Sequence, residues 1–214
     1  GMFGTNPLTI GIPPDEPFDF LIDCATSITQ NGKIEYYERI KKDVLPGTII
    51  GLDGEPVEGD AGAALKMIRN GTAALTTLGG IGEALGGYKG YGYAMAIELL
   101  SAALQDGNYG KALDGKDADG NKVPYHLGHF FIAIDTEHFL GEDVCRKKAG
   151  EIIRTVRASK KAPGAERIYT AGEKEYLVRL ARKDGVPINE SVQKEMVQIR
   201  DELKLTQYKF PWED

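Results

Sequence analysis

The sequence predicts an α/β protein in which short strands and amphipathic helices alternate along the chain. Compact apolar runs bounded by Gly and Pro, such as residues 8–12 and 128–135, are typical of strands. Longer stretches such as residues 142–158 repeat apolar side chains at every third or fourth position, which is typical of a helix with one buried face. Strands that alternate with helices favour a layered sheet covered by helices.

In the first half of the chain, turn residues separate the predicted elements. The strand over residues 8–12 ends at two prolines. Residues 18–24 alternate in polarity, and Asp23 closes this run with a carboxylate that needs a polar partner if it is buried. Thr26 and Ser27 offer caps for a helix that runs to about residue 42. Beyond it we expect a strand over residues 49–52, a helix over residues 60–68 capped by Asp60, and a connection over residues 73–78.

In the second half, a polar segment precedes the most apolar predicted strand. Residues 106–123 are polar and aperiodic and are expected to form a mobile surface loop, either an ornament of the fold or an active-site lid. Residues 128–135 (GHFFIAID) form a continuous apolar run, which predicts a strand buried on both faces. The remaining predicted elements are a helix over 142–158 with Val144, Ile152, Ile153 and Val156 inward, a strand over 167–170, helices over 173–182 and 190–203 with Ser191 as a cap, and an aromatic tail over 206–214 that docks on a neighbouring surface.

The composition argues against several classes of protein. The chain has 214 residues, of which 42% are hydrophobic and 27% charged, as in ordinary soluble globular proteins. Its net charge of -6 argues against a generic nucleic-acid binder, so the basic face of residues 142–158 is expected to be solvated. No apolar run is long enough to cross a membrane and no signal peptide is visible, which predicts a cytoplasmic location.

The cysteines and histidines do not form a recognisable metal site. Cys24 and Cys145 lie in separate apolar contexts and are expected to be buried, reduced thiols. His126, His129 and His138 lack the carboxylate or thiol spacing of a metal site, so no metal is expected. His129 directly precedes the apolar run and is expected to be structural or to line a site.

A glycine-dense stretch over residues 77–107 leads into an apolar helix in which Ala94, Ile97, Leu100 and Leu104 are expected to face the core. Glycine allows the backbone to approach a ligand closely, and a helix N-terminus attracts anions. Lys89 adds a cation at this junction, and aromatic faces come from Tyr88, Tyr91 and Tyr93. The stretch therefore predicts either a site for a planar ligand that carries a phosphate or carboxylate, or a glycine-rich turn before a core helix. The glycines are Gly79, Gly80, Gly82, Gly86, Gly87, Gly90 and Gly92.

Five segments, in order along the chain, carry a family resemblance. They are GTNPLTIGIP (4–13), FLIDCATSITQNGKIE (20–35), LGGYKGYGYAMAIELLSAAL (85–104), GHFFIAID (128–135) and AGEKE (171–175). Together they resemble the type-2 malate/L-lactate dehydrogenases, the non-Rossmann nicotinamide-dependent 2-oxoacid reductases that include ureidoglycolate, sulfolactate and diketogulonate enzymes. The resemblance implies a layered mixed sheet flanked by helices, similar to L-sulfolactate dehydrogenase, over residues 3–214, with C-terminal helices over residues 172–204.

The resemblance also implies roles for individual residues around NAD or NADP. Asp23 would be the acidic partner near the reacting centre, where it could orient or charge-balance an imidazole during proton transfer. The implied cofactor contacts are Asp19, Phe20, Leu21, Ile22, Asp23, Cys24, Ala25, Tyr88, Lys89, Gly172, Glu173 and Lys174. The turn that borders the same site consists of Gly4, Thr5, Asn6 and Pro7.

The resemblance departs from the family at the N-terminus. Members are longer, and their N-terminal region supplies a histidine that protonates the substrate oxygen, together with serine and arginine contacts to the substrate. Only three residues precede Gly4 here. Three interpretations follow: an incomplete cofactor-binding portion of a dehydrogenase for a small 2-hydroxy or 2-oxo acid, an enzyme completed by a separate N-terminal polypeptide or by the partner in a homodimer, or a non-catalytic nucleotide-binding module.

Overall fold

The computed structural model describes residues 1–213, and Asp214, the end of the aromatic tail, lies outside the described residues. The chain forms two compact units, residues 1–173 and 174–214. The strands are β1 (Leu8–Ile12), β2 (Phe20–Cys24), β3 (Ile49–Gly51) and β4 (Ala73–Leu75). The helices are α1 (Asn31–Arg39), α2 (Ala61–Arg69), α3 (Gly87–Ala102), α4 (Glu142–Arg157), α5 (Glu173–Ala181) and α6 (Glu190–Glu202), with short 3-10 turns η1 (Gly110–Asp114) and η2 (Thr136–His138).

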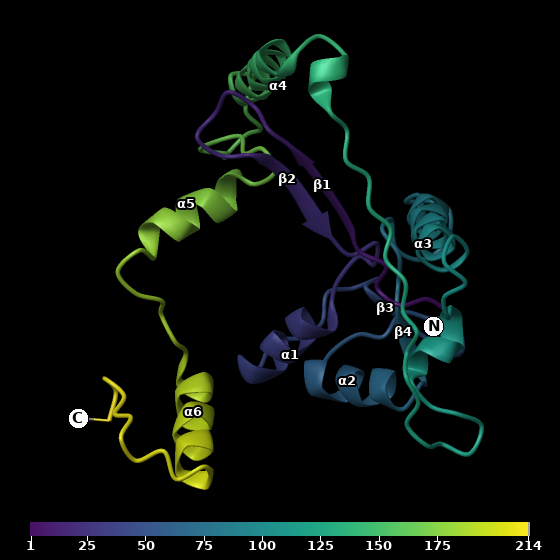
Figure 1. Ribbon diagram of the computed structural model, residues 1–214. Coiled ribbons are helices and arrows are strands. Elements are labelled where there is room, and N and C mark those ends of the chain that lie inside the picture. The colour runs from purple at the N-terminus through teal and green to yellow at the C-terminus, as the bar shows by residue number, and fades with distance from the viewer. Residues whose placement is uncertain (214) are drawn as a thin grey trace. The chain divides into compact units, whose positions relative to one another are not determined.

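The strands of the first unit form two separate antiparallel pairs in place of one layered sheet. β1 pairs with β2, so that Leu8 lies opposite Cys24 and Ile12 opposite Phe20. β3 pairs with β4 through three residues each. In Figure 1, the β1–β2 ribbon runs between α4 at one end and the β3–β4 pair at the other. The predicted α/β class therefore holds, whereas its strands are shorter and its sheets smaller than expected.

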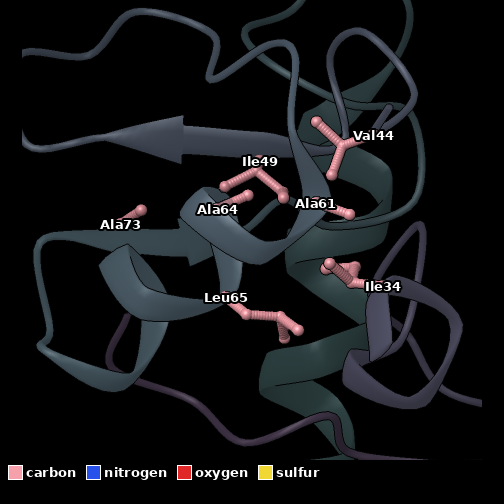
Figure 2. Close-up of a cluster of buried hydrophobic side chains, with 7 residues drawn as sticks. All are labelled: Ile34, Val44, Ile49, Ala61, Ala64, Leu65 and Ala73. Atoms are coloured by element: carbon pink, nitrogen blue, oxygen red, sulfur yellow. The ribbon is translucent and has the colours of Figure 1, made fainter. Parts of the chain in front are cut away.

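The main hydrophobic core lies between the β3–β4 pair and the helices α1 and α2. Figure 2 shows its seven buried side chains, which come from these elements and, for Val44, from the connection between α1 and β3: Ile34, Val44, Ile49, Ala61, Ala64, Leu65 and Ala73. Full burial of one Val, Leu or Ile side chain contributes about 1.5–3 kcal/mol. Asp60 caps α2 as predicted, because its carboxylate accepts a hydrogen bond from the Ala63 N–H at 2.8 Å. Local sequence signals thus predicted the helix α2 and its cap correctly.

The helix predicted to begin at Thr26 and Ser27 begins later, at Asn31. The reason is that both hydroxyls donate to backbone carbonyl oxygens that lie before the helix. The Thr26 hydroxyl donates towards the carbonyl oxygens of Thr5 and Asn6, and that of Ser27 donates to the Thr29 carbonyl. The two residues therefore anchor the chain that follows β2 and cap no helix.

The predicted strand over residues 128–135 is wrong for this chain, since these residues form no strand and Phe131 and Ile132 are exposed. Residues 167–170 also form no strand. Of the four residues of α4 predicted to face inward, Ile153 is buried, whereas Val144, Ile152 and Val156 are exposed. Both segments have the apolar pattern of a buried element, but apart from Ile153 the chain leaves these side chains exposed.

Three smaller expectations also need correction. Cys24 at the end of β2 is exposed and Cys145 is half-buried, so neither is the buried thiol that was predicted. In α3 the buried positions are Gly87, Gly90, Ala94, Glu98 and Ala102, and of the predicted stripe only Ala94 is fully buried. The segment 106–123 contains η1 and a turn in which Lys116 bridges Lys122, so it is more ordered than a structureless loop.

The second unit contains most of α5, all of α6 and the aromatic tail. Asn189, and not Ser191, caps α6 by accepting a hydrogen bond from the Val192 N–H. The tail folds back beside α6, where Arg200 pairs with Glu213 at 2.6 Å. The rings of Phe210 and Trp212 stack at 4.9 Å between centroids. The prediction that the tail docks on a neighbouring surface is confirmed for α6.

Candidate functional site

The glycine-dense loop lies directly on the first turns of α3. The Thr77 hydroxyl donates to the Gly87 carbonyl at 3.0 Å, and Gly86 precedes the helix with a left-handed φ of 84°. A Cβ at Gly90 would lie 2.5 Å from the Leu78 nitrogen and even closer to the Leu78 carbonyl oxygen. Only glycine allows this approach of backbone to helix, so the predicted glycine-rich junction is a packed feature of the fold.

The chain that leaves β2 joins the same junction. The Leu78 N–H donates to the Thr26 carbonyl at 2.9 Å, and Ser27 bridges Thr77. The Thr26 N–H donates to the Thr5 carbonyl at 2.9 Å. At one corner of the first unit, the loop that precedes α3 therefore meets the end of β2 and the turn over residues 4–7. We call this place the α3 corner.

Asn6 and Glu98 fasten this corner to α3. Asn6 has a positive φ of 40°, and its Nδ2 donates to the Ala94 carbonyl and to Glu98 Oε2, each at 2.8 Å. Glu98 is buried, and its Oε1 accepts from the Gly110 N–H at 2.6 Å. The sequence did carry a signal for this contact, because Glu98 is a carboxylate on the helix face that carries the small buried residues of α3. The sequence-based prediction did not include Glu98.

The start of β2 contacts a different predicted segment. The Leu21 N–H donates to the Ala171 carbonyl at 3.3 Å. Gly172 has a φ of 88°, and a Cβ there would collide with the Asp19 carbonyl oxygen. The turn over residues 171–172 therefore lies against residues 19–21, as a shared site requires.

Glu173 follows this turn, and its side chain is fully engaged. It is 1% exposed, and its carboxylate pairs with Arg167 and with Arg157, the latter at 3.7 Å. The Thr170 N–H also donates to it at 3.2 Å. Burial of a carboxylate needs such partners. The side chain of Glu173 thus holds the turn in place, and its own N–H donates to the Thr170 carbonyl at 3.1 Å.

Through Arg157, the ion pairs of Glu173 continue into a network that fixes the loop between β1 and β2 to α4. Arg154 pairs with Asp15 at 2.9 Å and with Glu16 at 2.6 Å, and Arg157 also pairs with Glu16. The hydrogen bond from Arg154 lowers the pKa of Asp15 below its usual value. Desolvation raises the pKa of Glu16, but hydrogen bonds from both arginines outweigh it and the net pKa is lowered.

The remaining predicted site residues differ in their surroundings. Asp23 is exposed and accepts a hydrogen bond from the Thr9 hydroxyl at 2.8 Å, so its carboxylate is available at the surface. Lys89 and Tyr88 are exposed at the start of α3, with the Lys89 ammonium 5.8 Å from the Tyr88 ring centroid. Lys174 belongs to the second unit.

β2 is the element that links these contacts. Its four residue steps span about 13 Å at roughly 3.3 Å per residue, with the 171–172 turn at its start and the α3 corner after its end. A separate hollow of ≈ 490 Å³ lies between β3 and α2, where Leu52, Asp53 and Met67 are among the lining residues. This hollow was not predicted and lies on elements that the five family-like segments do not include.

Comparison with known proteins decides the family. A profile described as malate/L-lactate dehydrogenase matches residues 1–197. The chain belongs to the malate/L-lactate dehydrogenase family. The malate dehydrogenase of Pyrococcus horikoshii is 38% identical over 200 residues, which make up 92% of this chain and 52% of that protein.

Solved structures confirm the predicted sulfolactate dehydrogenase-like α/β fold class, with the small sheets described above. Malate dehydrogenase from Entamoeba histolytica superposes with a TM-score of 0.87 at 37% identity, over 99% of this chain and 57% of that chain. Sulfolactate dehydrogenase from Methanocaldococcus jannaschii superposes with a TM-score of 0.69 at 30% identity, over 95% of this chain and 54% of that chain. The chain thus spans about half the length of the relatives that it matches. In residues 1–213, no helix has the length and apolar character of a membrane span.

Proposed function

We propose that this chain is the cofactor-binding portion of an NAD(P)-dependent oxidoreductase that transfers a hydride between nicotinamide and a small 2-hydroxy or 2-oxo acid. One observation carries the proposal: β2 contacts the 171–172 turn at its start and the α3 corner after its end. These are segments distant in sequence that the family resemblance assigns to one cofactor. Membership of the family supports the reaction class. In this proposal residues 3–214 act as one cofactor-binding portion.

The chemistry of the corner fits a dinucleotide. Helix α3 offers the positive partial charge of its N-terminus, and Lys89 adds a mobile cation beside it. The exposed Tyr88 ring offers a flat apolar surface for a planar group. At the other end of β2, the buried Glu173 side chain and its arginine partners hold the turn over residues 171–172 beside residues 19–21. Lys174 follows as a further proposed contact.

The residues of β2 lie between these two ends. We assign cofactor contacts to residues 19–25, with residues 4–7 bordering the site from the α3 corner. When bound, the nicotinamide supplies or accepts the hydride, and the chain's own residues position it. Asp23 is proposed to orient or charge-balance a catalytic imidazole, because its exposed carboxylate has a fixed direction through the Thr9 hydroxyl.

The acid that protonates the substrate is proposed to come from outside these residues. His138 is exposed and lies 3.5 Å from Asp135, and His129 uses its carbonyl to accept from Gln105. Neither belongs to the corner described above. General acid catalysis contributes about 10²–10⁴-fold, so the 214-residue chain by itself is expected to reduce pyruvate, oxaloacetate or glyoxylate negligibly. We further propose a homodimer that works in the cytoplasm.

Nucleotide titration tests the proposal. NADH and NADPH fluorescence is titrated with the wild-type chain and with Lys89→Ala, which removes the cation beside the α3 N-terminus. Lys42→Ala is the matched control, since Lys42 also lies over a tyrosine ring, at 5.1 Å from the Tyr37 centroid, in another part of the fold. We expect Lys89→Ala to weaken binding several-fold, about 0.5–1 kcal/mol or more for a helix-terminal charge, and Lys42→Ala to leave it unchanged. Equal affinities for all three chains would remove Lys89 from the site.

A further inference from the structure

Residues 130–134 (FFIAI) form an exposed apolar segment that we call the FFIAI segment. Phe131, Ile132 and Ile134 are 86%, 72% and 70% exposed. Across the described part of the chain, no hydrogen bond reaches the peptide groups of these five residues. Five consecutive peptide units without partners, flanked by large apolar side chains, are what an unpaired strand presents to another chain.

The FFIAI segment is held at both ends. On one side, Gly128 packs so closely against α3 that a Cβ there would collide with the Ser101 carbonyl oxygen, and the Asn108 N–H donates to the His126 carbonyl at 3.0 Å. On the other side, Asp135 begins η2 by accepting from the Glu137 N–H at 3.0 Å. In Figure 1 the chain runs extended between the region of α3 and η2. The segment is therefore extended and anchored at both ends.

Its sequence conflicts with this exposure. A continuous run of aromatic and β-branched residues is typical of a strand with both faces buried. A local preference that the surrounding fold does not satisfy points to a functional or interaction site. Exposed apolar residues that lie next to each other mark surfaces at which another polypeptide docks. The sequence of the FFIAI segment thus fits a sheet that this chain alone does not complete.

The β1–β2 ribbon also leaves apolar side chains uncovered. Ile10 and Ile12 on β1 and Leu21 on β2 are exposed large apolar side chains. Two-stranded ribbons are marginally stable by themselves and normally need a further strand or a covering helix. Two apolar strand surfaces in one unit therefore lack the layer that would cover them.

Relatives of this chain contain polypeptide beyond the part that it matches. The Entamoeba histolytica malate dehydrogenase superposes on 99% of this chain, which covers 57% of that protein, so 43% of it lies outside the match. The match lies in the C-terminal portion of the family. We propose that the FFIAI segment pairs, by strand addition, with a β-strand of a polypeptide equivalent to the N-terminal portion of these relatives. Backbone hydrogen bonds would supply the affinity, and pockets for alternate side chains the specificity. The inference rests on family membership and not on nucleotide binding.

Co-expression tests the pairing. The 214-residue chain is produced together with a tagged N-terminal portion of the Entamoeba histolytica malate dehydrogenase, the part outside the match. We expect a one-to-one complex in sedimentation velocity. Within it, amide hydrogen exchange of residues 130–134 should slow by about tenfold or more relative to the chain alone, because each paired amide must open before it exchanges.

Paired variants separate docking from folding. Ile132→Lys places a charge in the FFIAI segment, and Leu52→Lys makes the same change at a leucine that is 80% exposed in another part of the unit. Both variants should melt like the wild-type chain alone. Only Ile132→Lys should lose the complex and the protection of residues 130–134.

Three results would overturn the inference: no complex with fast exchange at residues 130–134, a complex that Ile132→Lys leaves intact, or self-association of the chain alone that protects these amides. The last result would assign the segment to a second copy of this chain. NADH titration of the complex is read separately, because a complex that forms without binding nucleotide supports strand addition and contradicts only the proposed function.

Discussion

The close approach of the glycine-rich loop to α3 can be tested by two substitutions in the same helix. Gly90→Ala places a methyl group 2.5 Å from the Leu78 nitrogen, the group that donates to the Thr26 carbonyl. Gly92→Ala places the same methyl group where no atom lies within 4 Å. Both residues are inside α3, so both substitutions gain the same helix propensity. The difference in stability between the two variants therefore isolates the effect of the contact between loop and helix.

The two substitutions are expected to change the free energy of unfolding in opposite directions. Replacement of glycine by alanine inside a helix stabilises it by roughly 0.5–1 kcal/mol, which is the whole effect expected for Gly92→Ala. At Gly90 the methyl group must displace backbone on both sides, and overpacking of this kind typically costs about 1–3 kcal/mol. For a chain of this length, 1 kcal/mol shifts the melting temperature by roughly 2–4 °C. Gly92→Ala should thus melt about 1–4 °C above the wild-type chain, and Gly90→Ala roughly 2–12 °C below Gly92→Ala.

Thermal unfolding followed by circular dichroism measures both variants, and NADH titration follows the site. Gly90→Ala should also weaken nucleotide binding, because moving Leu78 away from α3 opens the corner where β2 ends. Gly92→Ala should leave binding unchanged. If Gly90→Ala raises the melting temperature as much as Gly92→Ala does, the loop does not lie on the helix and the geometric basis of the site is wrong.

Three further predictions concern the contacts around this site. Glu98→Ala should lower the free energy of unfolding by about 1–3 kcal/mol, because it leaves buried donors unpaired; an unchanged urea midpoint would contradict the buried network. The lowered pKa values of Asp15 and Glu16 mean that their ion pairs stabilise the fold at neutral pH and lose this effect as the pH falls from their ordinary values of 3.8 and 4.5 through the lowered folded-state values. Arg154→Met should therefore be destabilised at pH 7 and show a shallower loss of melting temperature below about pH 4.5; parallel curves for variant and wild type would refute this linkage. Exposed Cys24 should react with a thiol reagent faster than the half-buried cysteine in α4, as measured by mass spectrometry of the native chain, and the reverse order would contradict the burial of the two thiols.

Much of the local structure followed from the sequence because its causes are local. The strand over residues 8–12, the cap at Asp60 and the glycine-rich start of α3 each depend on neighbouring residues, and the structure confirms all three. The family assignment was equally accessible, since five ordered segments are difficult to match by chance. The resemblance could also pair residues 19–21 with the 171–172 turn, which the structure places in contact.

Burial and hydrogen-bond partners were decided by the tertiary structure, because they depend on what faces a residue and not on its neighbours in sequence. Thr26 looks like a helix cap, yet its hydroxyl serves the turn over residues 4–7 from 20 positions away. Glu173 looks like a ligand contact, yet two arginines surround its carboxylate. The FFIAI segment has the composition of a buried strand, but composition specifies only a preference for burial. Whether that preference is met depends on the polypeptide that lies opposite, and this chain provides none for residues 130–134 among those the structure describes.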